Sequence, residues 1–158
     1  MSNRLYNFGS GPATMPLEVL EEIKDKFMDF GGMSVLEISH RGKAFADIME
    51  EASSLLKELL GIPNDYLILF EHGGAATQFA VVPMNFLDKK ASYALTGYWS
   101  KRAAAEARFF GEVEVAFTSE NSSFSRTPDP NELVISKDAS YLHITSNNTI
   151  YGTAYRDY

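Results

Sequence analysis

The strongest constraint on the fold is an alternation of short apolar runs with helical patterns after residue 65. The run Tyr-Leu-Ile-Leu-Phe, residues 66–70, is uniformly apolar, which predicts a strand buried on both faces of a sheet. A helical pattern resumes after Gly73-Gly74. The elements expected next are a strand over 91–95, a helix over 99–110 and a strand over 112–117. This order indicates an α/β fold with a mostly parallel sheet and flanking helices.

The amino-terminal part of the sequence predicts an arm and two helices. Residues 1–15 are rich in glycine and proline, which disfavour helices and central strands, so an extended arm is expected. Thr14 is expected to cap a first helix that ends at Gly31-Gly32. An amphipathic pattern predicts a second helix over residues 43–60.

The carboxyl-terminal part predicts a polar surface loop over residues 118–131 and a strand over residues 141–145. Residues 151–158 have a β-like pattern and no closing helix follows them. A sheet that stopped there would leave an apolar edge uncovered. We therefore expect residues 16–158 to be a partial domain whose remainder lies beyond Tyr158.

Composition limits the classes of function. The 158 residues include 45% apolar side chains, enough for a core, and carry 14 basic against 21 acidic residues, a net charge of -7. This charge argues against nucleic acid and anionic membranes as partners. The lack of cysteine excludes disulfides and zinc–thiolate sites, and no metal is expected. No apolar stretch has the length of a signal peptide core or a membrane span, so a cytoplasmic location is expected.

The sequence His-Gly-Gly-Ala-Ala-Thr-Gln-Phe, residues 72–79, is the best candidate for a phosphate site. Small residues at Gly74, Ala75 and Ala76 allow close approach, and the first N–H groups of a helix point toward a bound anion. The alternative is a tight turn that binds nothing. No Gly-Lys-Ser/Thr and no dinucleotide fingerprint occur, which argues against the common nucleotide sites.

Two further segments are expected at the same edge of the sheet. Trp99, the only tryptophan, lies where a strand passes into a helix and is placed to stack on an aromatic ring. Ser146-Asn147-Asn148-Thr149 follows another strand and offers amides and a hydroxyl. The alternatives are a core or interface role for Trp99 and simple turn chemistry for the second segment. Together the segments predict a site for a phosphorylated aromatic cofactor.

Two histidines receive different interpretations. His40 and Arg41 lie in the loop before the second helix and suit an anionic substrate, because arginine binds carboxylates and phosphates through two parallel hydrogen bonds. The alternative is an exposed Arg41 paired with Glu37. His143 lies within a strand pattern and is interpreted as a core or half-buried residue rather than a catalyst.

Five segments in this order resemble the phosphoserine aminotransferase family. They are Asn-Phe-Gly-Ser-Gly-Pro-Ala, Glu-Ile-Ser-His-Arg-Gly-Lys, His-Gly-Gly-Ala-Ala-Thr-Gln-Phe, Thr-Gly-Tyr-Trp-Ser and Ser-Asn-Asn-Thr-Ile-Tyr-Gly. The resemblance implies the large domain of a fold-type I enzyme that uses pyridoxal 5'-phosphate. It also implies a homodimer with its site near the dimer interface. The implied reaction moves an amino group between glutamate and 3-phosphohydroxypyruvate, giving 2-oxoglutarate and O-phosphoserine, and some members act on a related vitamin B6 intermediate.

The resemblance also implies roles for single residues. Ala75 and Ala76, beside Gly74, would bind the cofactor phosphate through their N–H groups. Trp99 would stack on the pyridine ring, and Thr149 would bind near its phenolic oxygen. His40 and Arg41 would hold the acidic groups of the substrate.

This sequence departs from the family pattern in three ways. Some members carry Gly-Arg in place of Ala75-Ala76, and some carry Glu in place of Asn148. The Schiff-base lysine and the aspartate that pairs with the pyridinium nitrogen lie beyond Tyr158 in the family, so this chain is expected to hold no catalytic residue and to be inactive alone. The alternatives are another class V aminotransferase or a non-catalytic anion-binding α/β module.

Overall fold

The computed structural model describes residues 4–156, and the chain divides into two compact units, Met1–Phe70 and Glu71–Tyr158. The predicted arm falls partly on residues 1–3, which lie outside the described residues. Residues 4–16 contain no helix or strand. The division into an arm of residues 1–15 and a partial domain of residues 16–158 stays a prediction.

The first unit contains helix α1 (Leu17–Met28), a short 3-10 helix (Val35–Glu37) and helix α2 (Lys43–Leu60). The prediction that Thr14 caps α1 is wrong. Pro16 occupies the N-cap position, and the Thr14 hydroxyl donates to the carbonyl of Asn7 at 2.9 Å instead. A cap at Thr14 would require a helical Met15, and the ring of the following proline disfavours that conformation.

Helix α2 has the predicted bounds and ends at Gly61, whose N–H donates to the carbonyl of Glu58 at 3.4 Å. Both helices of this unit have amphipathic sequences, yet no residue between 4 and 70 is buried. Leu17, Leu20, Ile23 and Phe27 have the spacing of one face of α1, yet their side chains are 36–48% exposed. The apolar periodicity therefore predicts that both helices exist, although α1 ends at Met28 rather than at Gly31-Gly32. It does not show what covers their apolar faces.

The predicted strand over residues 66–70 is wrong. These residues form no strand, and Leu67 is 86% exposed and Leu69 73% exposed. A short apolar run becomes a strand only where a neighbouring strand satisfies its backbone groups. Within residues 4–156 no strand pairs with this run.

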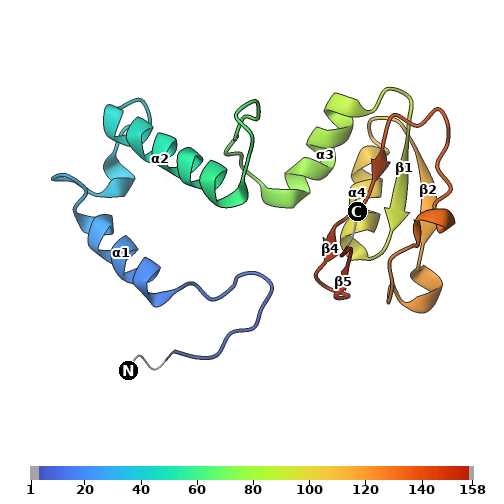
Figure 1. Cartoon of the computed structure of the whole chain (residues 1–158), viewed down its shortest axis with the longest axis horizontal. Helices are drawn as coiled ribbons and strands as arrows, with labels where there is room; N and C mark the ends of the chain where they lie inside the picture. Colours follow the sequence, from blue (N-terminus) through green and yellow to red (C-terminus); the bar gives the residue numbers. More distant parts are fainter. Residues whose placement is uncertain (1–3, 157–158) are drawn as a thin grey trace. The chain divides into compact units, whose positions relative to one another are not determined.

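The second unit contains the sheet (Figure 1). Its elements are α3 (Gly74–Phe86), β1 (Lys90–Leu95), α4 (Tyr98–Ala107), β2 (Glu112–Thr118), β3 (Leu142–His143), β4 (Asn147–Asn148) and β5 (Thr153–Ala154). The strand order is β2-β1-β3, and β1 pairs in parallel with both neighbours. Strands β4 and β5 form a separate antiparallel pair. The α/β fold with a mostly parallel sheet is thus confirmed, although only two of the five residues expected in the strand over 141–145 pair.

Two 3-10 helices interrupt the predicted polar loop after β2, at Glu120–Ser122 and Pro130–Glu132. Arg126 donates two hydrogen bonds to the Glu132 carboxylate, at 2.6 and 2.7 Å. Within residues 4–156, no helix combines the length and the apolar character needed to cross a membrane.

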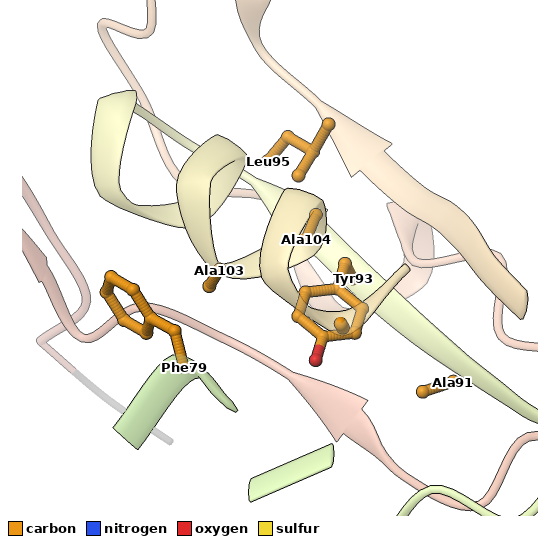
Figure 2. Packing of buried hydrophobic residues seen from close by; sticks show 7 residues of the cluster. Phe79, Ala91, Tyr93, Leu95, Ala103 and Ala104 are labelled. Atoms are coloured by element: carbon orange, nitrogen blue, oxygen red, sulfur yellow. The ribbon is translucent and has the colours of Figure 1, made fainter. Parts of the chain in front are cut away.

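The core lies between β1 and α4 (Figure 2). β1 is the central strand, which explains why all its residues after Lys90 are buried. The facing side of α4 consists of small side chains, Ala103, Ala104 and Ala107, each at most 1% exposed. Small side chains let α4 approach β1 closely. The larger side chains of Tyr93 and Phe79 fill the space that remains.

Candidate functional site

The second unit contains a cavity of about 550 Å³. The start of α3, one side of α4 and the segment after β3 form its walls. That position is the carboxyl end of β1 and β3, where open parallel sheets bind their ligands. The lining residues are Ala75, Ala76, Phe79, Trp99, Arg102, His143, Ile144, Thr145, Ser146, Asn147 and Thr149.

The first turn of α3 brings backbone N–H groups to the cavity. Gly73 precedes the helix with a φ of 86°, a conformation that favours glycine, and a β-carbon there would also collide with the side chain of Thr77. The side chain of Gln78 donates to Glu71 at 2.7 Å, across this turn. The N–H groups of Ala75 and Ala76 belong to the first turn, which has no partner within the helix for them. A helix start of this kind suits a phosphate.

The indole of Trp99 is the largest side chain at the cavity. Trp99 is half-buried, packs against the core and donates its Nε1–H to the hydroxyl of Thr149 at 2.9 Å. Because Thr149 accepts this bond, its own O–H is available as a donor. The two residues therefore combine a flat apolar surface with a hydroxyl at one edge.

His143 forms an uncharged aromatic part of the cavity wall. Its ring stacks on Tyr93 with a centroid distance of 4.7 Å and meets Phe79 edge-on at 6.4 Å. Burial lowers the pKa of His143 to about 4, so the ring is neutral at pH 7. Its Nε2 lies 3.3 Å from the hydroxyl of Thr145. The interpretation of His143 as half-buried is confirmed.

The structure brings four of the seven predicted site residues to one cavity, namely Ala75, Ala76, Trp99 and Thr149. Gly74 is the first residue of α3, but no strand precedes it as the sequence had predicted. His40 and Arg41 are exposed and belong to the first unit, so their role at the site stays a prediction.

The alternative of an Arg41–Glu37 pair is not found among residues 4–156. The Glu37 carboxylate accepts from the backbone N–H of Ser34 at 2.9 Å, where it forms part of a capping box. The N–H of Arg41 donates to the hydroxyl of Ser39 at 3.3 Å. The guanidinium of Arg41 thus has no ion-pair partner in the described part of the chain.

Sequence reasoning missed several cavity residues that periodicity would have found. Arg102 lies three positions after Trp99 and Phe79 lies three after Ala76, the spacing of one helix face. Thr145 lies two positions after His143, the spacing of one strand face. Arg102 supplies a positive charge at the cavity, and its Nε lies 3.9 Å from the Glu106 carboxylate.

The chain belongs to the aminotransferase class-V family, whose model matches residues 5–157. It is 50% identical to the phosphoserine aminotransferase of Lysinibacillus sphaericus (strain C3-41), over 100% of this chain and 45% of that protein. It is 49% identical to that of Bacillus subtilis (strain 168), over 98% of this chain and 44% of that protein. The chain therefore spans less than half the length of these curated relatives.

Solved structures give the same result. The phosphoserine aminotransferase of Bacillus circulans subsp. alkalophilus superposes with a TM-score of 0.93 at 45% identity, over 99% of this chain and 45% of that one. A phosphoserine aminotransferase of Trichomonas vaginalis, solved with pyridoxal phosphate bound, gives a TM-score of 0.89 at 36% identity, over 98% of this chain and 45% of that one.

Proposed function

We propose that this chain provides part of the cofactor-binding site of a pyridoxal-phosphate-dependent phosphoserine aminotransferase. The proposed reaction exchanges an amino group between glutamate and 3-phosphohydroxypyruvate, with O-phosphoserine and 2-oxoglutarate as products. The names of the relatives support this proposal. The observation that carries it is that the first turn of α3, the Trp99 indole and the Thr149 hydroxyl line the same cavity.

The residues present fit a phosphorylated pyridine. The cavity of about 550 Å³ falls within the range of small-molecule sites. The N–H groups at the start of α3 and the charge of Arg102 suit the phosphate, while Trp99 suits the ring face. Uncharged aromatic groups, including Phe79 and His143, complete the wall.

Pyridoxal phosphate, when bound, supplies the electron sink that transamination requires. The residues of this chain have simpler tasks. Ala75 and Ala76 would bind the phosphate through their N–H groups, and Trp99 would cover one ring face and keep water from it. The Thr149 hydroxyl, fixed by the Trp99 indole, would donate to a ring oxygen. His40 and Arg41 would bind the substrate's acidic groups.

Cofactor binding at this cavity can be tested with pyridoxine 5'-phosphate, which lacks the aldehyde and cannot react with surface lysines. Trp99 is the only tryptophan, so quenching of its fluorescence reports binding at this cavity. We expect pyridoxine 5'-phosphate to bind about tenfold or more tightly than pyridoxine, because the start of α3 recognises the phosphate. Equal affinities, or no quenching by either compound, would contradict the proposal.

Substrate choice is tested by comparing amino donors in the enzyme that contains this chain. A phosphoserine aminotransferase should use O-phosphoserine in clear preference to L-alanine and L-serine, since Arg41 would form charge-assisted bonds to the phosphate. Equal rates with the three donors would favour another class V aminotransferase. An Arg41→Lys variant should lose much of the preference, because lysine cannot form the paired bonds of arginine.

We further propose that the enzyme is a homodimer in the cytoplasm and that its site lies near the dimer interface. The family resemblance supports the dimer, and the exposed apolar faces of α1 and α2 are compatible with it. Light scattering coupled to gel filtration would measure the mass, and a monomer at micromolar concentration would contradict the proposal. A role in vitamin B6 synthesis would be tested with the corresponding phosphorylated intermediate as amino acceptor.

A further inference from the structure

We propose that Asn148 is a positioning residue whose buried side chain holds Trp99 and Thr149 in the arrangement that binds the cofactor. The inference rests on the proposed function, because it assigns a task within that same site. Asn148 itself does not line the cavity. It is 0% exposed and lies directly before Thr149, at the end of β4.

The side-chain amide of Asn148 bridges two segments that are about fifty residues apart in sequence. Its Oδ1 accepts the backbone N–H of Ser100 at 3.2 Å, and its Nδ2 donates to the hydroxyl of Thr96 at 2.9 Å. Thr96 and Ser100 are also 0% exposed. Buried hydrogen bonds of this kind are costly to break, since each partner left unsatisfied loses its solvation without compensation.

Ser100 closes the turn between β1 and α4 that this amide holds. Its hydroxyl accepts the N–H groups of Thr96 and Gly97, at 2.8 and 2.9 Å, and donates to the carbonyl of Gly97 at 2.8 Å. The turn is therefore a rigid unit, and Trp99 lies within the first turn of the helix that follows it. Asn148 is the side chain that connects this unit to β4.

The close approach of the two segments explains Gly97. A β-carbon at this position would lie 2.5 to 2.6 Å from the side chain of Asn148, which is too near for any real contact. Gly97 has a φ of 162°, an extended conformation open to other residues, so proximity to Asn148 is the reason that glycine is needed. The fit between Gly97 and Asn148 sets the distance between the walls of the cavity.

The buried hydrogen bond between Asn148 and Ser100 positions Trp99 and Thr149, because each adjoins one of its two partners in sequence. Trp99 precedes Ser100 and Thr149 follows Asn148, so one buried bond fixes the backbone on both sides of the Trp99–Thr149 contact. The Trp99–Thr149 bond lies at an exposed position, where water competes for both partners. The buried amide is therefore the contact able to maintain the geometry of the site before a ligand binds.

The first test is the affinity of Asn148→Ala for pyridoxine 5'-phosphate, measured through Trp99 quenching. We expect a loss of about tenfold or more with an unchanged far-UV circular dichroism spectrum. Asn121→Ala, at an exposed asparagine of the same unit, is the matched control and should bind as the original chain does. A purely structural role would lower the unfolding midpoint of Asn148→Ala and leave the affinity within twofold, which would overturn the inference.

A milder pair of variants decides the question if Asn148→Ala does not fold. Thr96→Val keeps the shape but removes the hydroxyl that Asn148 binds, whereas Thr96→Ser keeps the hydroxyl. We expect Thr96→Val to lose several-fold in affinity, and we expect Thr96→Ser to restore it to within about twofold. Equal affinities of the two variants would overturn the inference.

Amide hydrogen exchange separates this inference from the proposed function. If the original chain does not bind pyridoxine 5'-phosphate, the proposed function fails. The positioning step is then judged without ligand from the exchange rate of the Ser100 N–H, which Asn148 accepts. Faster exchange at Ser100 in Thr96→Val than in Thr96→Ser would support the positioning role of Asn148, and equal rates would overturn it.

Discussion

The two units of the chain contain similar amounts of apolar sequence but bury it to different extents. In the unit of residues 4–70, the side chains on the apolar faces of two amphipathic helices remain partly exposed. Ile23, for example, is 48% exposed. In the unit of residues 71–156, β1 has a strand on each side and α4 against one face, and Ala91 is 0% exposed. Burial thus follows from the parallel pairing of β1 rather than from the apolar pattern alone.

This difference bears on the site. The residues expected to bind the cofactor all belong to the packed unit, where core side chains and buried hydrogen bonds fix their backbone. The residues expected to bind the substrate, His40 and Arg41, belong to the exposed unit. A preorganised binding cavity is therefore found in the packed unit.

The largest effect that separates the units is expected from two matched phenylalanine truncations. Phe79→Ala should lower the free energy of unfolding by about 3–5 kcal/mol, because Phe79 is 8% exposed and its loss opens a cavity beside Ala103. Phe27→Ala should cost about 1 kcal/mol or less, because that side chain is already 45% exposed. Urea unfolding followed by circular dichroism measures both losses, and equal losses would show that the two units are packed alike.

The second effect is a dependence of stability on pH that arises from the packed unit. Burial lowers the pKa of His143 from its ordinary 6.5 to about 4. Between these values the unfolded chain binds a proton that the folded chain does not, so stability is full above pH 6.5 and falls as the pH drops toward 4. The loss approaches roughly 3 kcal/mol once the pH is below both pKa values.

The variant His143→Phe isolates this effect from the titration of carboxylates. It keeps an aromatic ring against Tyr93 and removes the ionisable group. The original chain should lose stability relative to His143→Phe between pH 7 and pH 4, as measured by urea unfolding at each pH. A stability difference that does not change with pH would show that His143 keeps its ordinary pKa.

The difference in strand pairing between the two units also explains how much of the fold could be predicted from the sequence. The helix over residues 43–60 was predicted with its bounds, and the strands at 91–95 and 112–117 were predicted to within one residue. Local periodicity and glycine stops determine such elements. The strand at 66–70 was predicted wrongly, because the sequence of a strand does not show whether a neighbour exists to pair with it.

Residues that line the cavity were predicted where their signals are local. A glycine pair before a helix and a tryptophan after a strand can be recognised from a few residues. Ala75 and Ala76, which follow the glycine pair, and Trp99 all line the cavity. The side-chain amide of Asn148 was predicted to face a ligand, with turn chemistry as the alternative. Neither interpretation identified its partners, Thr96 and Ser100, which are 52 and 48 residues away. Such pairings depend on the register between β1 and the segment after β3, and no short pattern encodes that register.

The smallest effect distinguishes two glycines that are needed for different reasons. A β-carbon at Gly111 would lie 2.9 Å from the carbonyl of Lys89 and would collide with the side chain of Leu87, so Gly111→Ala should cost about 1–3 kcal/mol of unfolding free energy. Gly31 has no atom within 4 Å of that position but has a φ of 72°, so Gly31→Ala should cost only the backbone term of about 1 kcal/mol. Changing Leu87 to alanine should recover part of the loss at Gly111, because it removes one of the two obstructing groups. If Gly111→Ala were as stable as the original chain, the tight packing assigned to the second unit would not extend to the turn between α4 and β2.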